Sequence, residues 1–324
     1  MSSAPRTNLP EPRGAVAQGW TRFSLTVPRE SIDALSYLLI ELGSPGVVAG
    51  ERDLRRTRSA ATSRRRRARV DGFFPATTPL PRLRATLRKA LAPVATEFPG
   101  IDLGAATLTR LGDDELGSTW QEHFPPVKLG RRFLVAPPWE SSHANGRVTL
   151  RIEPARAFGT GHHATTRSCV AALEDVCTPA RRRRGLDVGS GTGILSLVMR
   201  ALGVREVVAI DNDPLARQAT AEAARANRLA RVHVRDQLGR ARGRFDLIAA
   251  NLFAGLLVEL APALAARLEP KGALVVSGLL ARQEAEVRTA LGRSGLEVTA
   301  RRVLRGWVTL TAEPGGRRRR TTMR

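Results

Sequence analysis

The chain is poor in cysteine and aromatic residues, and it contains no long apolar run. Only two of its 324 residues are cysteines, Cys169 and Cys177, on one predicted helix. Two thiols do not make a disulfide framework, so we expect buried free thiols in a reducing cytoplasm. No stretch approaches the ~18 apolar residues that a membrane span requires, and residues 1–19 lack the apolar core of a signal peptide. Five scattered histidines give no metal-ligand spacing, so no metal site is expected.

Lysine is also scarce, although the chain is strongly basic. Arginine supplies all but three of the 52 basic residues, and the formal net charge is +22. Such a bias is typical of a GC-rich genome. The runs 64–67, 181–184 and 317–320 would attract polyanions such as RNA, or they lie in solvated loops and a tail. Aromatic residues make up 4% of the chain, and no RNA-stacking motif is interleaved with the arginines.

The first part of the chain, 1–112, has the periodicities of a small α+β domain. Its elements follow the order strand, helix, strand, strand, helix, strand, which is the ferredoxin-like order. An arginine-rich surface loop is expected at 51–69, and Gly43 is expected to close the first helix. The expected elements are a strand at 20–27, a helix at 31–42, strands at 46–49 and 70–74, a helix at 81–91 and a strand at 106–111.

Residues 113–150 are predicted to be a linker segment, because their prolines and glycines interrupt helices and strands before these become long. From 151 to 313, strands and helices alternate, which predicts a doubly wound α/β sheet. Two last runs predict an antiparallel hairpin at one edge of this sheet, and 314–324 is predicted to be a disordered basic tail. Before that hairpin we expect strands at 148–152, 207–210, 232–234, 245–250 and 273–276 and helices ending at 202 and spanning 214–227, 256–268 and 280–292; the hairpin runs are 296–304 and 306–312.

The most informative segment is Asp187-Val-Gly-Ser-Gly-Thr-Gly193, between a short apolar strand and an apolar helix. Glycines at 189, 191 and 193 let the backbone turn sharply and approach a ligand closely. Asp211 ends the next apolar run, one helix and one strand later. A carboxylate there can accept hydrogen bonds from both hydroxyls of a ribose.

The glycine spacing favours S-adenosylmethionine (AdoMet) over a dinucleotide. A dinucleotide fingerprint reads G-x-G-x-x-G and seats a pyrophosphate on the helix N-terminus, whereas this turn reads G-x-G-x-G. Asp187, two residues before the first glycine, suits a ligand without phosphates whose ammonium is drawn towards a carboxylate. A plain strand–helix turn is the alternative, and the agreement with Asp211 weighs against it.

Two further segments fall near the expected ligand. Asn251 directly follows an apolar strand, where its amide can donate to and accept from a ligand or serve as a turn residue. The tetrad Asn251-Leu-Phe-Ala254 lacks the prolines and aromatic slot that hold a planar amine, which argues against glutamine, adenine or cytosine amines as targets. Phe158-Gly-Thr-Gly161 is a loop that would cover the methionine end of AdoMet, and Thr165–Thr166 can cap the next helix.

Several blocks are similar to those of a known family in order and spacing. They are Ala157-Phe-Gly-Thr-Gly-His-His-Ala-Thr-Thr166, Asp187–Leu195, Ile210-Asp-Asn-Asp-Pro214, Ala250-Asn-Leu-Phe-Ala-Gly255 and Ser277-Gly-Leu-Leu280. Through them the chain resembles the PrmA family, the AdoMet-dependent methyltransferases of large-subunit ribosomal protein eleven, over roughly residues 20–312. The resemblance implies a class I, Rossmann-like catalytic domain and an N-terminal domain that recognises the protein substrate. It also implies methylation of lysine ε-amines, an N-terminal α-amine, or both.

The resemblance implies cofactor contacts at Thr166, Gly189, Asp211 and Asn251. The family's Thr-His-Pro is His162-His163-Ala164 in this chain, a departure that bears on the substrate more than on the chemistry. Asn251 is expected to orient the amine, and His163 is the best-placed proton acceptor by sequence, although a structural role suits it equally. The whole expected cofactor site is Phe158, Gly159, Thr160, Gly161, Thr166, Asp187, Gly189, Gly191, Gly193, Asp211 and Asn251.

We therefore expect a cytoplasmic, monomeric methyltransferase that moves a methyl group in line from AdoMet to a neutral amine of a ribosomal protein. No membrane partner is expected, and non-specific attraction of RNA by the arginine runs stays open. An RNA or small-molecule methyltransferase on the same fold is one alternative, because it would share the glycine turn and Asp211. A non-catalytic AdoMet-binding module is the other.

Overall fold

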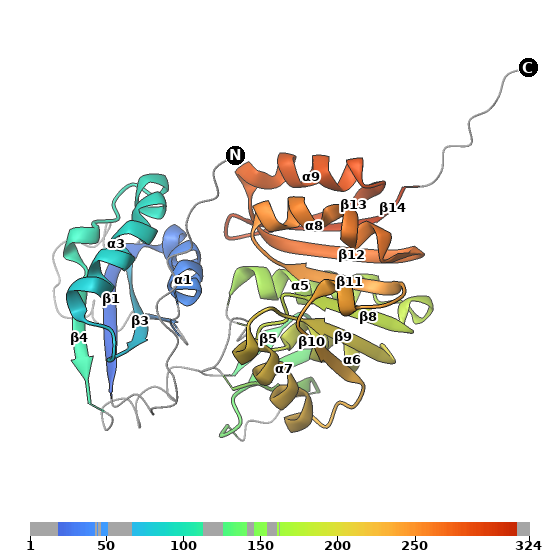
Figure 1. The fold of residues 1–324 in the computed structure, drawn as a ribbon, viewed down its shortest axis with the longest axis horizontal. Helices are drawn as coiled ribbons and strands as arrows, with labels where there is room; N and C mark the ends of the chain where they lie inside the picture. Colours follow the sequence, from blue (N-terminus) through green and yellow to red (C-terminus); the bar gives the residue numbers. More distant parts are fainter. Residues whose placement is uncertain are drawn as a thin grey trace, which may run out of the picture. The chain divides into compact units, whose positions relative to one another are not determined.

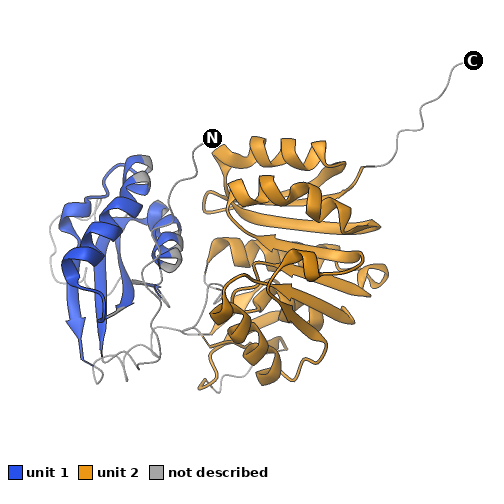
Figure 2. Cartoon of the chain, viewed as in Figure 1, with its two compact units in different colours: residues 1–123 blue, residues 124–324 orange. Residues whose placement is uncertain are grey.

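The chain divides into two compact units, Met1–His123 and Phe124–Arg324 (Figure 2). The computed structural model describes residues 19–42, 44, 47–50, 67–112, 126–140, 146–153, 161 and 163–315. Gly43, expected to close the first helix, lies outside these residues. Within them, every helix is too short or too polar to cross a membrane.

The first unit contains a four-stranded antiparallel sheet and two helices that share one core (Figure 1). The strand order is β2-β3-β1-β4. Leu35 of the first helix and Leu83 and Leu87 of the second pack against the buried strand residues Phe23 and Val70. The elements are β1 (Trp20–Pro28), η1 (Arg29–Ser31), α1 (Ile32–Glu41), β2 (Val47–Gly50), β3 (Arg67–Pro75), α3 (Leu80–Glu97), η2 (Leu103–Ala105) and β4 (Thr107–Leu111).

The succession of strands and helices in this unit is the one that the sequence predicts, with one correction. The predicted arginine-rich loop 51–69 ends too late, because Arg67 already belongs to β3. Ala68 is buried, and the guanidinium of Arg67 donates to the carbonyls of Thr26 and Gly100. A run of arginines hides the start of a strand from a hydropathy pattern, because only alternate residues face the core.

The second unit is built on a seven-stranded mixed sheet of order β10-β9-β8-β11-β12-β14-β13. Neighbours from β10 to β12 are parallel, and β14 is antiparallel to both β12 and β13, which confirms the predicted doubly wound sheet with an edge hairpin. Its elements are α5 (Ala164–Val176), η4 (Pro179–Arg181), β8 (Arg184–Val188), α6 (Ile194–Ala201), β9 (Glu206–Ile210), α7 (Pro214–Ala226), β10 (Val232–Arg235), η5 (Leu238–Arg240), β11 (Phe245–Asn251), α8 (Ala254–Ala266), β12 (Leu268–Leu280), η6 (Ala281–Gln283), α9 (Glu284–Arg293), β13 (Leu296–Leu304) and β14 (Trp307–Pro314).

Helices cover both faces of this sheet, and each face has its own core (Figure 1). Along β11, Leu247 and Ala249 join α5 and α6 in one core, while Ile248 and Ala250 join α8 and α9 in the other. Successive side chains of a strand point to opposite faces, so a strand buried on both sides is apolar at every position. This is why residues 247–250 of β11 form a continuous apolar run in the sequence.

Part of the predicted linker segment 113–150 contributes strands to the second unit. β5 (Val127–Leu129), β6 (Phe133–Ala136) and β7 (Val148–Arg151) form a three-stranded sheet of order β5-β6-β7. Leu129, Phe133 and Leu150 are buried in the same core as α5 and α6. Strands of three or four residues are too short for their periodicity to rise above the flanking prolines.

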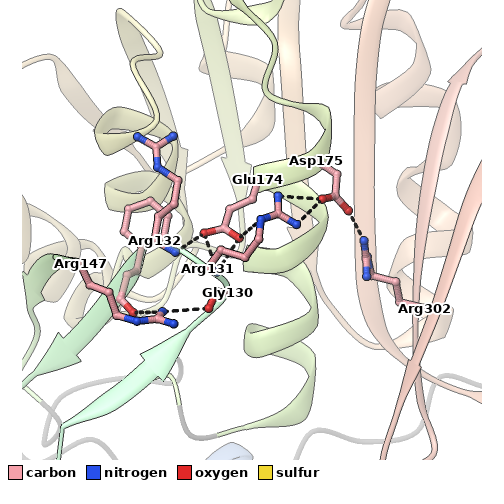
Figure 3. Close-up of polar contacts among 8 residues, drawn as sticks. Gly130, Arg131, Arg132, Arg147, Glu174, Asp175 and Arg302 are labelled. Atoms are coloured by element: carbon pink, nitrogen blue, oxygen red, sulfur yellow. Dashed lines mark hydrogen bonds and ion pairs between the residues drawn. The ribbon is translucent and has the colours of Figure 1, made fainter. Parts of the chain in front are cut away.

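The turn between β5 and β6 is fixed to α5 by a buried carboxylate (Figure 3). Glu174 accepts hydrogen bonds from the backbone N–H of Arg131, at 2.8 and 3.0 Å to its two oxygens, and of Arg132 at 2.8 Å. Its side chain is 1% exposed. Gly130, at φ +52°, has no room for a side chain, since a Cβ there would lie 2.5 Å from Oε2 of Glu174. Asp175, the next residue, is 36% exposed and pairs with Arg131 and Arg302.

The buried and the exposed carboxylate make a matched pair of substitutions. Glu174→Ala should lower the free energy of unfolding by about 1.5–3 kcal/mol, because it removes hydrogen bonds from a charged acceptor to the turn. Asp175→Ala should cost about 1 kcal/mol or less, because its ion pairs are open to solvent. Urea denaturation of the full chain measures both. Equal losses for the two variants would contradict a special role for Glu174.

Candidate functional site

The structure brings most of the predicted cofactor residues to the carboxyl edge of the seven-stranded sheet. β8 lies between β9 and β11 and is parallel to both. Parallel strands end at the same edge, so the glycine turn after β8, Asp211 after β9 and Asn251 at the end of β11 are neighbours. Asp236 directly follows β10 and therefore lies at this edge as well.

The glycine turn is held by backbone bonds to the end of β9. The N–H groups of Gly189 and Ser190 both donate to the carbonyl of Ile210, at 2.8 and 2.9 Å. Gly189 and Gly193 have φ of +76° and +81°, a region that favours glycine. A Cβ at Gly189 would lie 2.4 Å from Leu252, and one at Gly193 would lie 3.1 Å from the Cα of Thr220. The turn therefore requires glycine at both positions.

Asp211 is bonded directly to the glycine turn. Its Oδ2 accepts from the N–H of Gly191 at 2.9 Å, and its Oδ1 accepts from the N–H of Asp213 at 3.0 Å. Burial raises the pKa of the Asp211 carboxyl, and these two N–H groups oppose the rise. Each carboxylate oxygen accepts more than one hydrogen bond, so both oxygens retain capacity for a pair of hydroxyl donors.

Asp187 is fully buried, and one of its oxygens has no partner. Oδ2 accepts from the backbone N–H of Ser196 at 2.9 Å and from its hydroxyl at 2.7 Å. Oδ1 makes no hydrogen bond within the described part of the chain. Burial raises the pKa of this carboxyl from 3.8 to about 7; Ser196 lowers it, and the charge of Asp211 adds to the rise. A cationic ligand group at Oδ1 would stabilise the ionised form.

Thr166 offers a second buried polar atom without a partner. It lies in the first turn of α5 with 0% of its surface exposed, and among the described residues its Oγ1 has no hydrogen bond. Unsatisfied buried oxygens are rare and call for a missing partner. Oγ1 of Thr166 and Oδ1 of Asp187 are each suited to the polar methionine end of AdoMet, whose ammonium and carboxylate need such partners.

Asn251 is oriented by a directed chain of hydrogen bonds. Its Nδ2 donates to Oγ1 of Thr165 at 3.1 Å, and that oxygen lies 2.7 Å from Nδ1 of His163. Nδ1 also accepts from the backbone N–H of Thr165 at 3.3 Å, so it is an acceptor and the hydroxyl proton of Thr165 points to it. The imidazole proton is thereby assigned to Nε2. The His163 ring meets Trp307 edge to face, with the ring centroids 5.1 Å apart.

The N-cap of α5 is His163, so the prediction that Thr165–Thr166 caps this helix is wrong. Nδ1 of His163 accepts from the N–H of Thr165 at 3.3 Å. The two threonines lie inside the first helical turn, and both are buried. A hydroxyl is the commoner cap, but here the hydroxyl of Thr165 is committed to Asn251.

Other predicted residues lie at the limits of the described chain. Phe158, Gly159, Thr160 and His162 lie outside the described residues. Gly161 is buried at φ +87°, and a Cβ there would lie 3.2 Å from Leu129 and 3.5 Å from Ile194. Since Ile194 is the first residue of α6, the loop ends beside the glycine turn.

Sequence reasoning missed three residues that shape this edge: Ser196, Thr165 as the partner of Asn251, and Trp307. Ser196 left a usable signal, because it is the one polar residue in the apolar stretch Ile194–Met199. For Thr165 the sequence suggested a different role, that of capping the helix. Trp307 gave no signal, because it is brought to His163 by the sheet, 144 positions further along the chain.

Comparisons with known proteins agree with this geometry. The family described as ribosomal protein L11 methyltransferase (PrmA) matches residues 19–314. The ribosomal protein L11 methyltransferase of Geobacter sulfurreducens is 35% identical over 282 residues, which is 87% of this chain and 93% of that protein. That of Symbiobacterium thermophilum is 36% identical over 250 residues, 75% of this chain and 80% of that protein. The crystal structure of a ribosomal protein L11 methylase from Lactobacillus delbrueckii subsp. bulgaricus is 27% identical, with a TM-score of 0.55 over 59% of this chain and 98% of that one.

The raised pKa of Asp187 predicts a pH-dependent stability. The folded pKa, about 7, lies above the ordinary 3.8, so the neutral form favours folding. This contribution is complete below pH ~4 and is lost as the pH rises through about 7. Asp187→Asn keeps an acceptor for Ser196 and removes the ionisation. Its unfolding free energy relative to wild type should therefore rise between pH ~4 and ~8, as measured by urea denaturation without AdoMet.

Saturating AdoMet provides the control for this prediction. Its ammonium would favour the ionised carboxylate, so the rise should shrink when AdoMet is bound to both proteins. A difference between the two proteins that stays constant over the whole range would mean that Asp187 titrates normally.

Proposed function

The chain belongs to the PrmA family of ribosomal protein L11 methyltransferases, and from this membership we propose that it methylates amines of ribosomal protein L11. The donor is AdoMet, and the enzyme is a protein N-methyltransferase. The observation that carries the proposal is the bond from Gly191 to Asp211, which joins the glycine turn and the ribose-binding acid into one site. We propose that it works as a cytoplasmic monomer on L11 lysine ε-amines, the N-terminal α-amine, or both.

Named residues would hold the cofactor in this site. Asp211 would accept from the ribose hydroxyls, and the turn at Gly189–Gly193 would allow the nucleoside to approach the backbone. Oδ1 of Asp187 and Oγ1 of Thr166 would meet the methionine end, which the loop Phe158–Gly161 would cover. When bound, AdoMet supplies an electrophilic methyl group on its sulfonium.

The amide orientation of Asn251 favours an amine as the methyl acceptor. Its Nδ2 uses one of its two N–H groups to donate to Thr165, which fixes the amide so that Oδ1 and the other N–H remain for a substrate. An acceptor oxygen binds an N–H of a neutral amine and leaves the nitrogen lone pair available for attack. Asn251 thus orients the amine by a hydrogen bond, and positioning of this kind supplies much of the rate in direct transfer.

We infer that His163 positions residues rather than accepting the substrate's proton. Its Nδ1 already accepts from the hydroxyl and the N–H of Thr165, and its other ring nitrogen carries the proton in this arrangement. A lysine amine, with a pKa of ~10.4, must lose a proton before attack. Water is then the acceptor that the site leaves for that proton.

We propose that the first unit is a ferredoxin-like domain that recognises the protein substrate. Its βαββαβ succession and antiparallel strand order support the assignment. Binding energy from such remote contacts orients the reacting amine. Two arginines of the run 181–184 are engaged within the protein: Arg181 pairs with Glu313, and Arg184 donates to the carbonyls of Arg242 and Arg244. The other runs lie largely outside the described residues.

A transfer assay tests the function directly. Methyl groups from radiolabelled AdoMet should appear on purified L11 and not on ribosomal RNA. Asp211→Ala should weaken AdoMet binding roughly tenfold to a hundredfold, because charge-assisted hydrogen bonds of about 1.5–3 kcal/mol are lost. Label in RNA would favour an RNA methyltransferase, and AdoMet binding without transfer to L11 would favour a non-catalytic module. Unchanged AdoMet affinity in folded Asp211→Ala would refute the assigned site.

Substitutions at Thr165 test the orientation of Asn251. Thr165→Val keeps the shape of the side chain and removes the hydroxyl between Asn251 and His163, so kcat should fall roughly tenfold to a hundredfold from misplacement of the amine. Thr165→Ser restores the hydroxyl and should stay close to wild type. The Kd for AdoMet, measured by calorimetry, should change little in either. A Thr165→Val enzyme with full kcat would show that the amide needs no such support.

A further inference from the structure

The amino-terminal edge of the seven-stranded sheet, opposite the proposed methyl-transfer site, carries a row of exposed cations. Eight of them lie in the segments that lead into β8, β9, β10, β11 and β13, and Lys271 lies near the start of β12, so they line one edge in the order of the strands. We call this set the amino-edge row. Its members are Arg183, Arg205, Arg225, Arg228, Arg231, Arg242, Arg244, Lys271 and Arg293.

The amino-edge row is not neutralised within the described part of the chain. No member forms an ion pair there, whereas nearby acids are engaged elsewhere. Asp246 accepts from backbone N–H groups, Glu313 pairs with Arg181, and Glu206 lies 3.8 Å from Arg184. Arg244 donates to the carbonyl of Leu268, which leaves its charge without a counter-ion. Exposed cations that lack an ion pair in the described chain are available to an anionic ligand.

The cations of this edge repel one another. Burial and the charge of Arg231 together lower the pKa of Arg200, at the end of α6. Arg182, beside the row, has a buried Nε without a hydrogen-bond partner among the described residues. Bound anions would reduce the repulsion and could supply the missing acceptor.

The spacing and chemistry of the row suit the backbone of a helical nucleic acid. Neighbouring strands lie about 4.8 Å apart, so the row extends cations along the edge in successive steps, as the phosphates of a duplex extend along its axis. The edge offers no stacking platform, since the exposed large hydrophobic residues of the described chain are Trp139, Val148, Leu215, Phe253 and Val303, none of them in these segments. Unpaired strands are held by stacking on aromatic rings, whereas duplexes are held through phosphates.

We propose that the amino-edge row binds the phosphate backbone of helical RNA while the opposite edge of the same sheet performs methyl transfer. The choice of RNA over DNA rests on the proposed function, because a ribosomal protein is met beside RNA helices. The row would hold the enzyme against such a helix without reading its sequence.

Backbone conformation provides a matched set of variants. Arg228 and Arg231 have φ of +54° and +64°, and Arg305, in the β13–β14 turn at the opposite edge, has φ of +52°. Glycine suits this region, so Arg228→Gly, Arg231→Gly and Arg305→Gly each remove one charge and relieve the same backbone strain. Thermal melts confirm that each variant is folded. Net charge is the same in all three variants, and the lost charge lies at the amino edge in two of them and at the opposite edge in the third.

The probe is a fluorescein-labelled 20-base-pair RNA duplex of mixed sequence, followed by anisotropy across a salt series. Arg228→Gly and Arg231→Gly should each weaken binding roughly fivefold to tenfold at 100 mM salt and reduce the salt slope by about one. Arg305→Gly should match wild type. Equal weakening by all three variants, or by none, would refute the row. Absence of wild-type binding at 50 mM salt, or tighter binding of an unpaired RNA strand, would also refute it. Binding is measured without AdoMet or L11, so these outcomes are independent of the methyl-transfer assay.

Discussion

Three successive backbone N–H groups organise the carboxyl edge of this molecule. Those of Gly189 and Ser190 donate to the carbonyl of Ile210, and that of Gly191 donates to the side chain of Asp211. They hold the end of β8 against the end of β9, and they place the acid directly beside the glycines. The positive φ values of the turn, and the exclusion of side chains at Gly189 and Gly193, follow from this arrangement.

The parts of the site that the sequence predicts are those fixed by strand order. In a parallel sheet, residues that end neighbouring strands must meet, so Asp211 and Asn251 are placed by counting elements alone. The direction of a side-chain hydrogen bond is not determined by strand order. That Thr165 turns to Asn251 while His163 caps α5 depends on rotamers set by packing, which no local pattern encodes. Trp307 reaches His163 only because β14 joins the sheet.

The same distinction holds for the fold. Long strands with two buried faces, such as β11, read clearly as apolar runs, whereas the short β5 and β6 are masked by prolines and turns. The arginines at the start of β3 suggest a loop, because over two or three residues the charged side chains obscure the alternation of buried and exposed positions. Hydrophobic patterns detect buried residues, and they miss the start of a strand whose first residues are polar.

The two edges of the catalytic sheet differ electrically. The carboxyl edge is approached by helix N-termini and holds Asp187 and Asp211, while arginines gather where α6, α7 and α9 end. Cations at helix C-termini are stabilised by the helix dipole, so the fold tolerates them there at little expense in stability. Arginines that a GC-rich genome favours can therefore accumulate at this edge without disturbing the opposite edge.

The hydrogen bonds between Glu174 and the β5–β6 turn also determine where this chain can be truncated. A fragment starting at residue 151 would lose Leu129, Phe133 and Leu150 and uncover the apolar surface of α5 that they occupy. A fragment starting at Phe124 keeps all three strands together with their anchor on α5. For joining another domain to the second unit in place of the first, the junction belongs ahead of β5.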